Sequence, residues 1–472
     1  MRILLVSHDF LPNHPSGTEV YTWQLGTALK ARGHEVHVFT TDKDVGRPNL
    51  RVDLREYGGL PVHELVNNLF YNDFRETWDY PPVSRSFGLF LDDLKPDLVH
   101  FMHLLYLSVG CIEEAYKRRL PVIFTLHDYW LQCPRFGQRV HANQSICHTI
   151  DFKRCGECLA NFKFRQTRAE RASAKLIASV HQRTGMDLGP AARRVADLLK
   201  RRAPSAVGPL PDESSNDWTE RCLDREGAVM VRDDELRQRL LPHVHRFLAP
   251  SYFLRESFLQ WGIPEEQIVY SRAGIDLTPF EGFQRIPGDK VRVAFIGTLA
   301  PHKGPHVLLA AWKALPPELR AKGELTIYGP KTHNPGYVAQ LEAEAATCGA
   351  VLAGGLTRSE VVRALGRVDL LVVPSVWYEN SPLIILEALA TSTPLAVTDL
   401  GGMAELVKPG ISGFRFKMGD AGDLARVLGD VLRDPGLLSA LYPSGCDVKG
   451  IDVDAGELLA LYSAARKAVA GR

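Results

Sequence analysis

Features typical of membrane, secreted and nucleic-acid-binding proteins are missing from this sequence. No apolar run reaches the roughly 18 residues that a membrane-spanning helix needs, and the opening segment Met1–Asp9 turns polar too early for a signal peptide. The formal net charge is +1, so no whole-chain field attracts nucleic acid. We therefore expect a cytoplasmic protein with reduced thiols and no nucleic-acid partner.

Several phosphate-binding signatures are also absent. In the turn Gly297–Gly304, Lys303 precedes the second glycine and no Ser or Thr follows it, so this is not a Walker A loop. No Gly-x-Gly-x-x-Gly follows the first expected strand, which disfavours a nicotinamide cofactor. No Asp-x-Asp lies at a strand end facing a cleft, so we expect no catalytic divalent metal, and lysine and helix dipoles must meet any phosphate charge.

The 472 residues, 45% of them apolar and 24% charged, suit a globular protein of two or three domains. Short β-branched runs alternate with helical patterns, such as the expected helix 18–32, in two separate sets. This alternation predicts parallel sheets covered by helices. The expected strands are 3–7, 35–41, 97–101, 121–126, 246–251, 267–270, 291–297, 324–328, 350–352, 369–373 and 394–398.

The two sets predict two domains and a C-terminal helix. We place an N-terminal domain at 1–272, with an insertion at about 133–245 where the alternation stops. A C-terminal domain follows at 273–445, and 446–472 is expected to form a helix that packs back on the N-terminal domain.

The strongest motif lies where an apolar strand ends at Val373. Ser381 suits an N-cap and Pro382 the first helical turn, so we expect a helix from Pro382 to about Thr391. Its free N–H groups and positive dipole end would point to the carboxyl edge of the sheet, where doubly wound sheets bind phosphate.

Two glutamates flank the start of this expected helix. Glu379 lies in the loop before it, and Glu387 lies one to two turns inside it. Since a carboxylate accepts from two donors at once, sugar and ribose hydroxyls are good partners for both. Two exposed helix-end charges are the alternative, but the flanking strand, cap and proline favour binding. The residues expected to bind with them are Asn380, Ser381, Pro382 and Leu383.

These motifs together resemble the retaining glycosyltransferases of family 4, which have the GT-B fold. Glu379-x7-Glu387 matches the family signature, and Gly297–Gly304 is similar to its phosphate loop, with Lys303 on the donor diphosphate. The resemblance spans 1–132 and about 246–435 and leaves the insertion unexplained. Further segments that match in type and spacing are Arg272–Asp276, Tyr328–Pro330, Gly354–Leu356 and Asp399–Glu405.

The resemblance implies an α/β protein of GT-B type, with two Rossmann-like, doubly wound parallel-sheet domains facing across a cleft. It implies transfer of a sugar from a nucleotide-diphosphate donor to an acceptor hydroxyl with retention of configuration. The acceptor would be a glycan or lipid-linked molecule of polysaccharide or glycolipid biosynthesis. The implied catalytic residues are Glu379, His127 and Lys303, and further implied donor-binding residues are Glu387, Gly17 and Thr298.

Two positions depart from the family pattern. Many relatives have arginine where this chain has Thr298, so half of the usual cationic clamp is missing or is supplied by His302 or Arg272. The family usually shows two adjacent glycines after the first strand, and here Ser16-Gly17 has one. That glycine suits backbone N–H groups approaching a donor or acceptor, and a plain strand-to-helix turn is the alternative.

His127 follows an expected strand. The resemblance places it at the donor sugar near the reacting carbon, where a neutral imidazole can bond a hydroxyl; a structural histidine is the other interpretation. Asp128 would orient it or begin the next turn. His8 and Asp9 occupy the equivalent edge of the first strand.

Four of the eight cysteines lie within 26 residues of the insertion, at Cys133, Cys147, Cys155 and Cys158. Four thiolates in a reduced compartment suit structural zinc, which would stabilise a loop too irregular to bury a core and shape the acceptor side. His141 and His148 are alternative ligands, and an iron–sulfur cluster or free or redox-paired thiols are alternative states.

Basic residues gather at Arg193–Arg202. This segment fits a solvated helix face or a peripheral contact with anionic lipid, or a lipid-diphosphate acceptor, at the inner face of the membrane. Two other functions share the architecture: a sugar-nucleotide epimerase, and an inactive GT-B protein that only binds its ligand.

Overall fold

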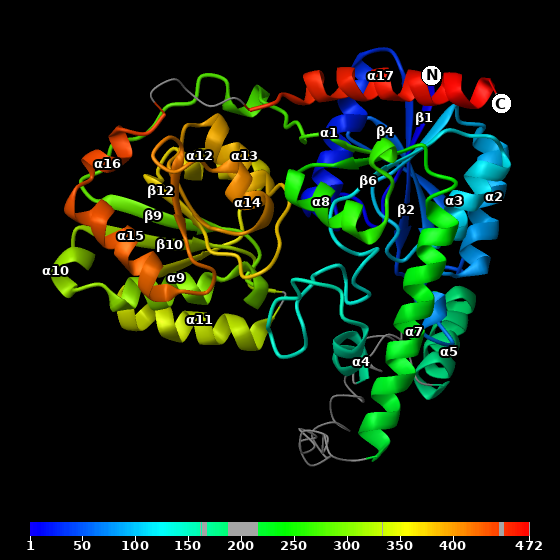
Figure 1. The fold of residues 1–472 in the computed structure, drawn as a ribbon, viewed down its shortest axis with the longest axis horizontal. Coiled ribbons are helices and arrows are strands. Elements are labelled where there is room, and N and C mark those ends of the chain that lie inside the picture. The colour runs from blue at the N-terminus through cyan, green and yellow to red at the C-terminus, as the bar shows by residue number, and fades with distance from the viewer. Residues whose placement is uncertain (161, 163–167, 187–215, 333, 443–447, 472) are drawn as a thin grey trace. The chain divides into compact units, whose positions relative to one another are not determined.

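The computed structural model describes residues 1–160, 162, 168–186, 216–332, 334–442 and 448–471. The chain forms two compact units, one made of Met1–Leu248, Trp261–Val269 and Leu458–Arg472, the other of Ala249–Gln260 and Tyr270–Glu457 (Figure 1). The basic segment Arg193–Arg202 lies outside the described residues. Within the described residues, every helix is too short or too polar to cross a bilayer.

The first unit is built on an eight-stranded sheet of order β3-β4-β2-β1-β5-β6-β7-β8. The central strand β1 pairs in parallel with β2 and β5, and β3 pairs antiparallel with β4 at one edge. The strands are β1 (Arg2–Val6), β2 (Glu35–Asp42), β3 (Val52–Tyr57), β4 (Leu60–Val66), β5 (Leu98–Phe101), β6 (Val122–Thr125), β7 (Arg246–Ala249) and β8 (Ile268–Tyr270).

Helices cover this sheet, and the helices α4, α5 and α7 of the insertion project away from it (Figure 1). In the insertion, α4 packs closely on α7, so that a Cβ at Gly156 would lie 2.4 Å from the carbonyl oxygen of Cys222. The last part of α17 belongs to this unit, where the Tyr462 hydroxyl lies 2.6 Å from Nδ1 of His100. The helices are α1 (Gly17–Ala31), η1 (Arg75–Thr77), α2 (Pro81–Leu94), α3 (Gly110–Lys117), α4 (Phe152–Ala160), α5 (Arg168–Thr184), α7 (Asn216–Leu240) and α17 (Ile451–Ala470).

The second unit holds a six-stranded sheet of order β11-β10-β9-β12-β13-β14, in which neighbouring strands are parallel. Its strands are β9 (Val291–Ile296), β10 (Gly323–Tyr328), β11 (Val351–Gly354), β12 (Leu370–Val373), β13 (Leu395–Thr398) and β14 (Gly413–Phe416). The helices and turns are α8 (Tyr252–Trp261), η3 (Thr278–Phe280), η4 (Pro301–Lys303), α9 (Pro305–Ala314), α10 (Pro317–Arg320), α11 (Pro335–Cys348), α12 (Arg358–Leu365), α13 (Leu383–Ala390), α14 (Gly401–Leu406), α15 (Ala421–Arg433) and α16 (Gly436–Ser439). The short turn η2 (Glu265–Gln267) belongs to the first unit.

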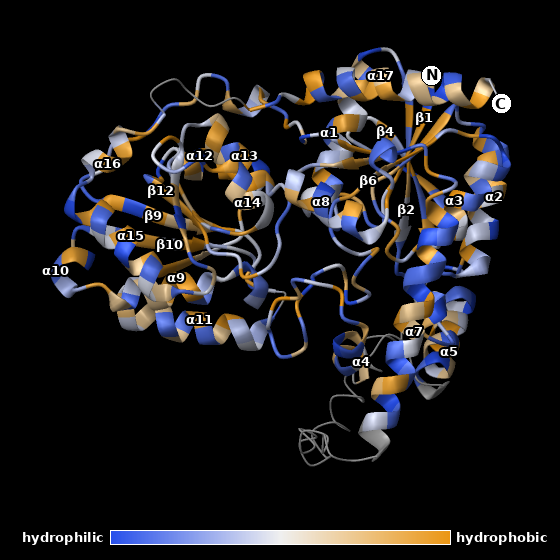
Figure 2. Cartoon of the chain, viewed as in Figure 1, coloured by the Kyte–Doolittle hydropathy of each residue, from blue (hydrophilic) through white to orange (hydrophobic). Residues whose placement is uncertain are grey.

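The central part of the second sheet is buried on both faces, because its strands are mostly apolar. Val293 and Leu370 belong to one core layer, together with side chains of α9, α11 and α15. Their strand neighbours Ala294 and Leu371 belong to a second layer, with side chains of α13 and α14. The strands are accordingly hydrophobic along their length, whereas the covering helices alternate between polar and apolar residues (Figure 2). Continuous apolar runs of this kind are typical of parallel sheets.

Both sheets reverse their strand order at their first strand. β1 lies between β2 and β5, and β9 lies between β10 and β12. Doubly wound sheets bind ligands beyond the carboxyl ends of the strands at such a reversal. A ligand-binding site is therefore expected at the loops after β1, β5, β9 and β12.

Candidate functional site

In the second unit, the loops after β9 and β12 meet at the point where the strand order reverses. Gly304 has φ +73°, and a Cβ there would lie 1.9 Å from the carbonyl oxygen of Pro374. Only glycine fits such an approach. The N–H of Val376 also donates to the carbonyl of His302, at 2.8 Å. Together these contacts fix Lys303 beside the loop that carries Glu379.

Lys303, which is half-buried, forms an ion pair with the buried Glu379. The Lys303 Nζ lies 2.6 Å from Oε1 of Glu379, and the Ser375 hydroxyl donates to the same oxygen at 3.0 Å. Burial alone would raise the pKa of Glu379, but the charge of Lys303 and these hydrogen bonds outweigh it and lower the pKa. Glu379 is thus a buried carboxylate that stays ionised.

The ring of Trp377 covers this pair. Lys303 Nζ lies 4.9 Å from the ring centroid, a cation–π distance, and the His302 ring meets Trp377 edge-on with centroids also 4.9 Å apart. Burial and the neighbouring Lys303 charge lower the pKa of His302 to about 4. A pKa of about 4 makes His302 neutral near pH 7, which disfavours the expectation that it supplies a second cation.

The backbone of the Glu379 loop is held from the other side by α14. The N–H of Gly402 donates to the Glu379 carbonyl at 3.0 Å. A Cβ on Gly402 would lie 1.8 Å from the carbonyl oxygen of Asn380, so this contact also requires glycine. Two glycines, Gly304 and Gly402, thus fix the loop that positions Glu379.

The helix after this loop begins one residue later than the sequence suggests. α13 runs from Leu383 to Ala390 with Pro382 as the N-cap, and Ser381 lies outside it. Pro382 has ψ 122°, an extended value, so it precedes the helix instead of forming its first turn. The predicted Ser381 cap is therefore wrong. The Ser381 hydroxyl is instead buried without a hydrogen-bond partner among the described residues.

Glu387 lies in the second turn of α13 and is buried. Burial raises its pKa to about 7, and the charge of Arg358 opposes this only in part. Near neutral pH this carboxyl therefore exists in both protonation states. It differs in this respect from Glu379, which has a lysine partner. Thr298 lies in the loop after β9, where its carbonyl accepts from the N–H of Ala300 at 2.9 Å.

The first unit carries a second polar cluster at the reversal of its own sheet. A histidine lies two residues after the last residue of each of three neighbouring strands: His8 after β1, His103 after β5 and His127 after β6. The His8 and His103 rings have centroids 4.4 Å apart. Glu19 from α1 joins them, with Oε1 3.6 Å from Nδ1 of His8.

Burial disfavours the charged forms of His8, His127 and Glu19. It lowers the pKa of His127 to about 3 and that of His8 well below its usual range, with neighbouring histidines adding to the effect. Burial also raises the pKa of Glu19 to about 7, although the Ser16 hydroxyl donates to its carboxylate and opposes the shift. His127 is therefore an uncharged imidazole throughout the physiological range.

Asp128 orients the histidine of the neighbouring strand. The N–H of Leu105 donates to Nδ1 of His103 at 2.9 Å, so that ring carries its proton on Nε2 and donates to Asp128 at 3.1 Å. The other Asp128 oxygen accepts from the N–H of Trp130 at 2.7 Å. The sequence singled out Asp128 as an orienting group for His127, but its recorded partner is His103.

Gly17 begins α1 at the same edge of the first sheet. A Cβ there would meet no atom within 4 Å, so the fold itself does not demand glycine and leaves open space in front of it.

The four insertion cysteines line one cavity, but they do not form a finished metal site. In the described part of the chain, no three His, Cys, Asp or Glu side chains are already placed to hold an ion. Burial raises the pKa of the Cys133 thiol to about 11 and that of Cys155 to about 12. These cysteines are thus not poised as nucleophiles.

Within each unit, the structure brings part of the predicted set together. Lys303, Glu379 and the start of α13 share one sheet edge of the second unit. The sequence analysis missed three residues that touch the expected ones: Ser375, Glu19 and His103. The recurrence of a histidine two residues after neighbouring strands is the signal that would have found His103.

Comparisons with known proteins agree with this picture. A family model described as Glycosyl transferases group 1 matches residues 279–445, and one described as Glycosyltransferase Family 4 matches residues 15–207. The D-inositol 3-phosphate glycosyltransferase of Thermobispora bispora is 30% identical over 203 residues, which cover 40% of this chain and 47% of that protein. The glycogen synthase of Mycobacterium tuberculosis is 32% identical over 173 residues, covering 36% and 41%. The chain thus matches less than half the length of these curated relatives.

Solved structures resemble the chain along its whole length. Sucrose-phosphate synthase from Thermosynechococcus elongatus has a TM-score of 0.60 at 17% identity, covering 99% of both chains. Anabaena HepE, solved in complex with UDP and glucose, has a TM-score of 0.57 at 15% identity, covering 100% of this chain and 98% of that one. These likenesses establish a shared fold.

Proposed function

This chain belongs to family 4 of the glycosyltransferases and has the GT-B fold, and we propose that it transfers a sugar from a nucleotide-diphosphate sugar to an acceptor hydroxyl with retention of anomeric configuration. The Lys303–Glu379 ion pair is the observation that carries this proposal. It joins a phosphate-binding cation to a sugar-binding carboxylate at the reversal point of a doubly wound sheet. HepE, which shares the fold, was solved with UDP and glucose.

In this proposal, the donor diphosphate binds Lys303 and the N-terminal end of α13. The free N–H groups of the first helical turn and the buried Ser381 hydroxyl are suitable donors to phosphate oxygens. Glu379 binds hydroxyls of the donor sugar, and Glu387 binds the ribose. Asn380, Pro382, Leu383 and Thr298 complete this part of the donor site, and Arg272 is the remaining candidate for a second cation.

The reaction exchanges one bond at the anomeric carbon for another. The bond from that carbon to the diphosphate oxygen breaks, and a bond to the acceptor oxygen forms on the same face. The acceptor proton passes to the departing phosphate, so no side chain has to act as base. Lys303 and the helix end stabilise the charge that develops on the diphosphate, and we expect transfer without added Mg²⁺ or Mn²⁺.

The first unit would contribute neutral groups. His127 is the proposed contact to a hydroxyl of the donor sugar, and its low pKa suits a hydrogen bond without charge. The open space in front of Gly17 suits the approach of a donor phosphate or an acceptor. For the acceptor we propose a glycan or lipid-linked sugar of polysaccharide or glycolipid biosynthesis, used in the cytoplasm or at the inner face of the membrane; this part rests on the family alone.

A donor screen followed by product analysis tests the proposal. We would measure thermal stabilisation by UDP-, GDP- and ADP-sugars and incubate the donor that binds with a panel of glycan and lipid-linked acceptors. The expected product is an α-linked glycoside from an α-linked donor, detected by proton NMR. Conversion of the donor sugar without acceptor would indicate an epimerase, and binding without turnover across the panel would indicate an inactive protein. Either result would refute the proposed transfer.

A further inference from the structure

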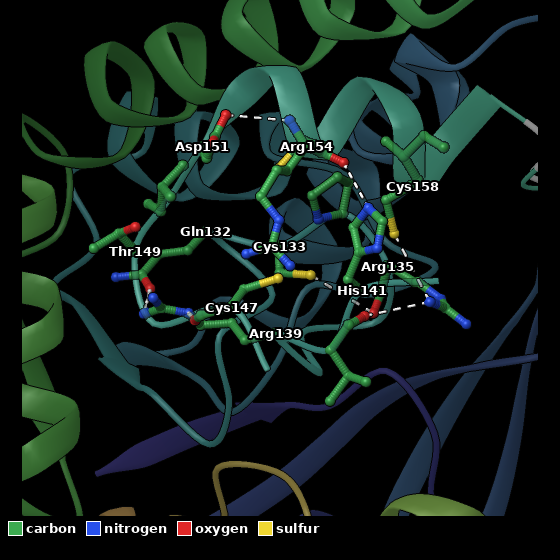
Figure 3. Close-up of a pocket in the computed structure, with 15 residues that line it drawn as sticks. Gln132, Cys133, Arg135, Arg139, His141, Cys147, Thr149, Asp151, Arg154 and Cys158 are labelled. Atoms are coloured by element: carbon green, nitrogen blue, oxygen red, sulfur yellow. Dashed lines mark hydrogen bonds between the residues drawn. The ribbon is translucent and has the colours of Figure 1, made fainter. Parts of the chain in front are cut away.

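The four cysteines of the insertion line a single cavity although they come from three parts of the chain. Figure 3 labels three of them, Cys133, Cys147 and Cys158. Cys133 lies in the loop after β6. Cys147 follows a short hairpin that the Val140–Ile146 bridge closes. Cys155 and Cys158 lie one turn apart on α4, so they share one face of that helix. All four are free thiols. The three-residue spacing on α4 and the course of the loop that precedes it bring the four sulfur atoms to the same cavity.

The size of the cavity suits one ion. Its volume is about 30 Å³, which is room for one or two water-sized particles. A single ion bound by the surrounding sulfurs would fit such a space.

The charges around the cavity suit a negatively charged centre. Three guanidinium groups line it, those of Arg135, Arg139 and Arg154, against one carboxylate, Asp151. A zinc ion with four thiolates carries two net negative charges, which these arginines offset. Arg135 Nη1 already lies 3.8 Å from Sγ of Cys158, where it can donate a hydrogen bond to this sulfur once the thiolate binds a metal ion.

The nearby histidine is not free to be a ligand. Nε2 of His141 lies 3.1 Å from the carbonyl oxygen of Arg154, and its Nδ1 accepts from the N–H of Asn143 at 3.4 Å. Both ring nitrogens therefore have backbone partners. This favours a ligand set of cysteines alone.

The cysteine-bearing part of the insertion, residues 133–160, has little regular structure besides α4. Its small core consists of buried Phe74, Leu159 and Val229, with Cys155 among the partly buried side chains at its edge. Residues 133–150 form turns and one isolated bridge pair. Segments that bury so little apolar surface usually need a metal or a covalent link to keep one conformation.

We propose that Cys133, Cys147, Cys155 and Cys158 bind one zinc ion in a tetrahedral structural site. The thiols do not already sit at coordinating positions, so the side chains must turn toward the ion, and each thiol gives up its proton to solvent as it binds. With four protein ligands the coordination sphere is closed, so the ion has no open position for a substrate.

The proposed ion would stabilise the loop that follows β6. The N–H of Cys133 donates to the carbonyl of Tyr129 at 2.7 Å, two residues beyond His127. From the other side, the buried guanidinium of Arg232 on α7 donates to the carbonyls of Trp130 and Leu131 at 2.6 and 3.0 Å. The proposed zinc site and α7 would thus both hold the segment that directly follows His127.

Metal analysis of the full-length protein, purified under reducing conditions, tests this inference. We expect about one zinc per chain in the wild type and about a tenth of that or less in a Cys155→Ser/Cys158→Ser double variant. The control is Cys222→Ser, which removes a thiol on α7 that does not line the cavity and should leave the zinc content unchanged. Replacement of zinc by Co²⁺ should give an intense thiolate-to-metal absorption band.

A second measurement on the wild type avoids any misfolding of the variants. Alkylation with and without a chelator, read by mass spectrometry, should show the four insertion cysteines protected until zinc is removed, with Cys222 unaffected by the chelator. Four results would each overturn the proposal. The double variant could retain zinc, two of the four cysteines could form a disulfide, the protein could contain iron with sulfide, or the wild type could bind neither Zn²⁺ nor Co²⁺. None of these results depends on nucleotide-sugar binding.

Discussion

The two sheets both gather polar side chains at their carboxyl edges, but they leave them in opposite states of ionisation. In the second unit, Lys303 holds Glu379 as a buried carboxylate with a lowered pKa. In the first unit, His8 and His127 are driven toward neutral forms, and the Glu19 pKa rises to about 7. Burial acts at both edges, so the presence of a lysine makes the difference.

We call the sheet edge with Lys303 and Glu379 the charged edge, and the sheet edge with His8, Glu19 and His127 the neutral edge. The contrast suggests that the two edges bind different parts of the donor. A diphosphate is permanently charged and needs a cation and backbone dipoles, which the edge with Lys303 supplies. Sugar hydroxyls are neutral, and an uncharged imidazole such as that of His127 can bond them without the cost of burying a charge. The following predictions test whether the two edges differ in this way.

The largest expected effect follows from removing the carboxylate of the charged edge. Glu379→Ala should lower kcat/KM by about 10³-fold or more, because the contact to the donor sugar is lost where the reaction occurs. Binding of the nucleoside diphosphate alone should remain. The matched control is Glu342→Ala, which breaks an exposed Lys331–Glu342 pair with a similar distance of 2.8 Å. A fully active Glu379→Ala enzyme would refute the assigned site.

Lys303→Met tests the other half of the pair. Loss of the cation should raise the donor KM by about 100-fold, since it removes the diphosphate contact and leaves Glu379 buried without its partner. The loss should be larger for a nucleoside diphosphate than for a monophosphate in calorimetric titrations. Lys331→Met removes the exposed lysine of the comparison pair and should change neither affinity. Equal losses for both nucleotides would mean that Lys303 acts only through the loop conformation.

His127→Ala examines the neutral edge. We expect kcat/KM to fall by about 10- to 100-fold through loss of a hydrogen bond to the substrate. Because the His127 pKa is about 3, the shape of the pH profile between pH 5 and 8 should not change. His34, just before β2 at the amino edge of the same sheet, provides the control His34→Ala. An acid limb that disappears with His127 would show that this edge is charged after all.

The sequence made the charged edge easier to predict than the neutral one. Glu379 and Glu387 belong to one contiguous strand–loop–helix segment, and Lys303 lies in one glycine turn. The neutral edge is assembled from separate segments, and Glu19 and His103 carry no local motif that marks them. Only the order of the strands brings their ends together.

The fold was predictable where burial alone decides it. Apolar strands such as Val291–Ile296 and Leu370–Val373 lie within a residue or two of the expected ranges. The β3–β4 hairpin was missed, although Gly58-Gly59 between two alternating runs is a recognised hairpin signal. The first residue of α13 was misplaced because proline suits both the N-cap and the first turn, and only its ψ angle separates the two.

The smallest effect concerns Glu387, which lies in the second unit like Glu379 but pairs with no lysine among the described residues. With a pKa of about 7, it is mostly protonated at pH 6 and mostly ionised at pH 8. The ionised form accepts from the ribose hydroxyls through both oxygens in stronger, charge-assisted hydrogen bonds, so donor affinity should fall as pH drops, by up to about tenfold between pH 8 and pH 6. Glu387→Gln should bind more weakly and lose this dependence in the same titrations, whereas Glu342→Gln should keep it. An affinity that is unchanged over this range in the wild type would mean that Glu387 does not hold the ribose as an anion, and it would place this carboxyl with the neutral groups of the first unit.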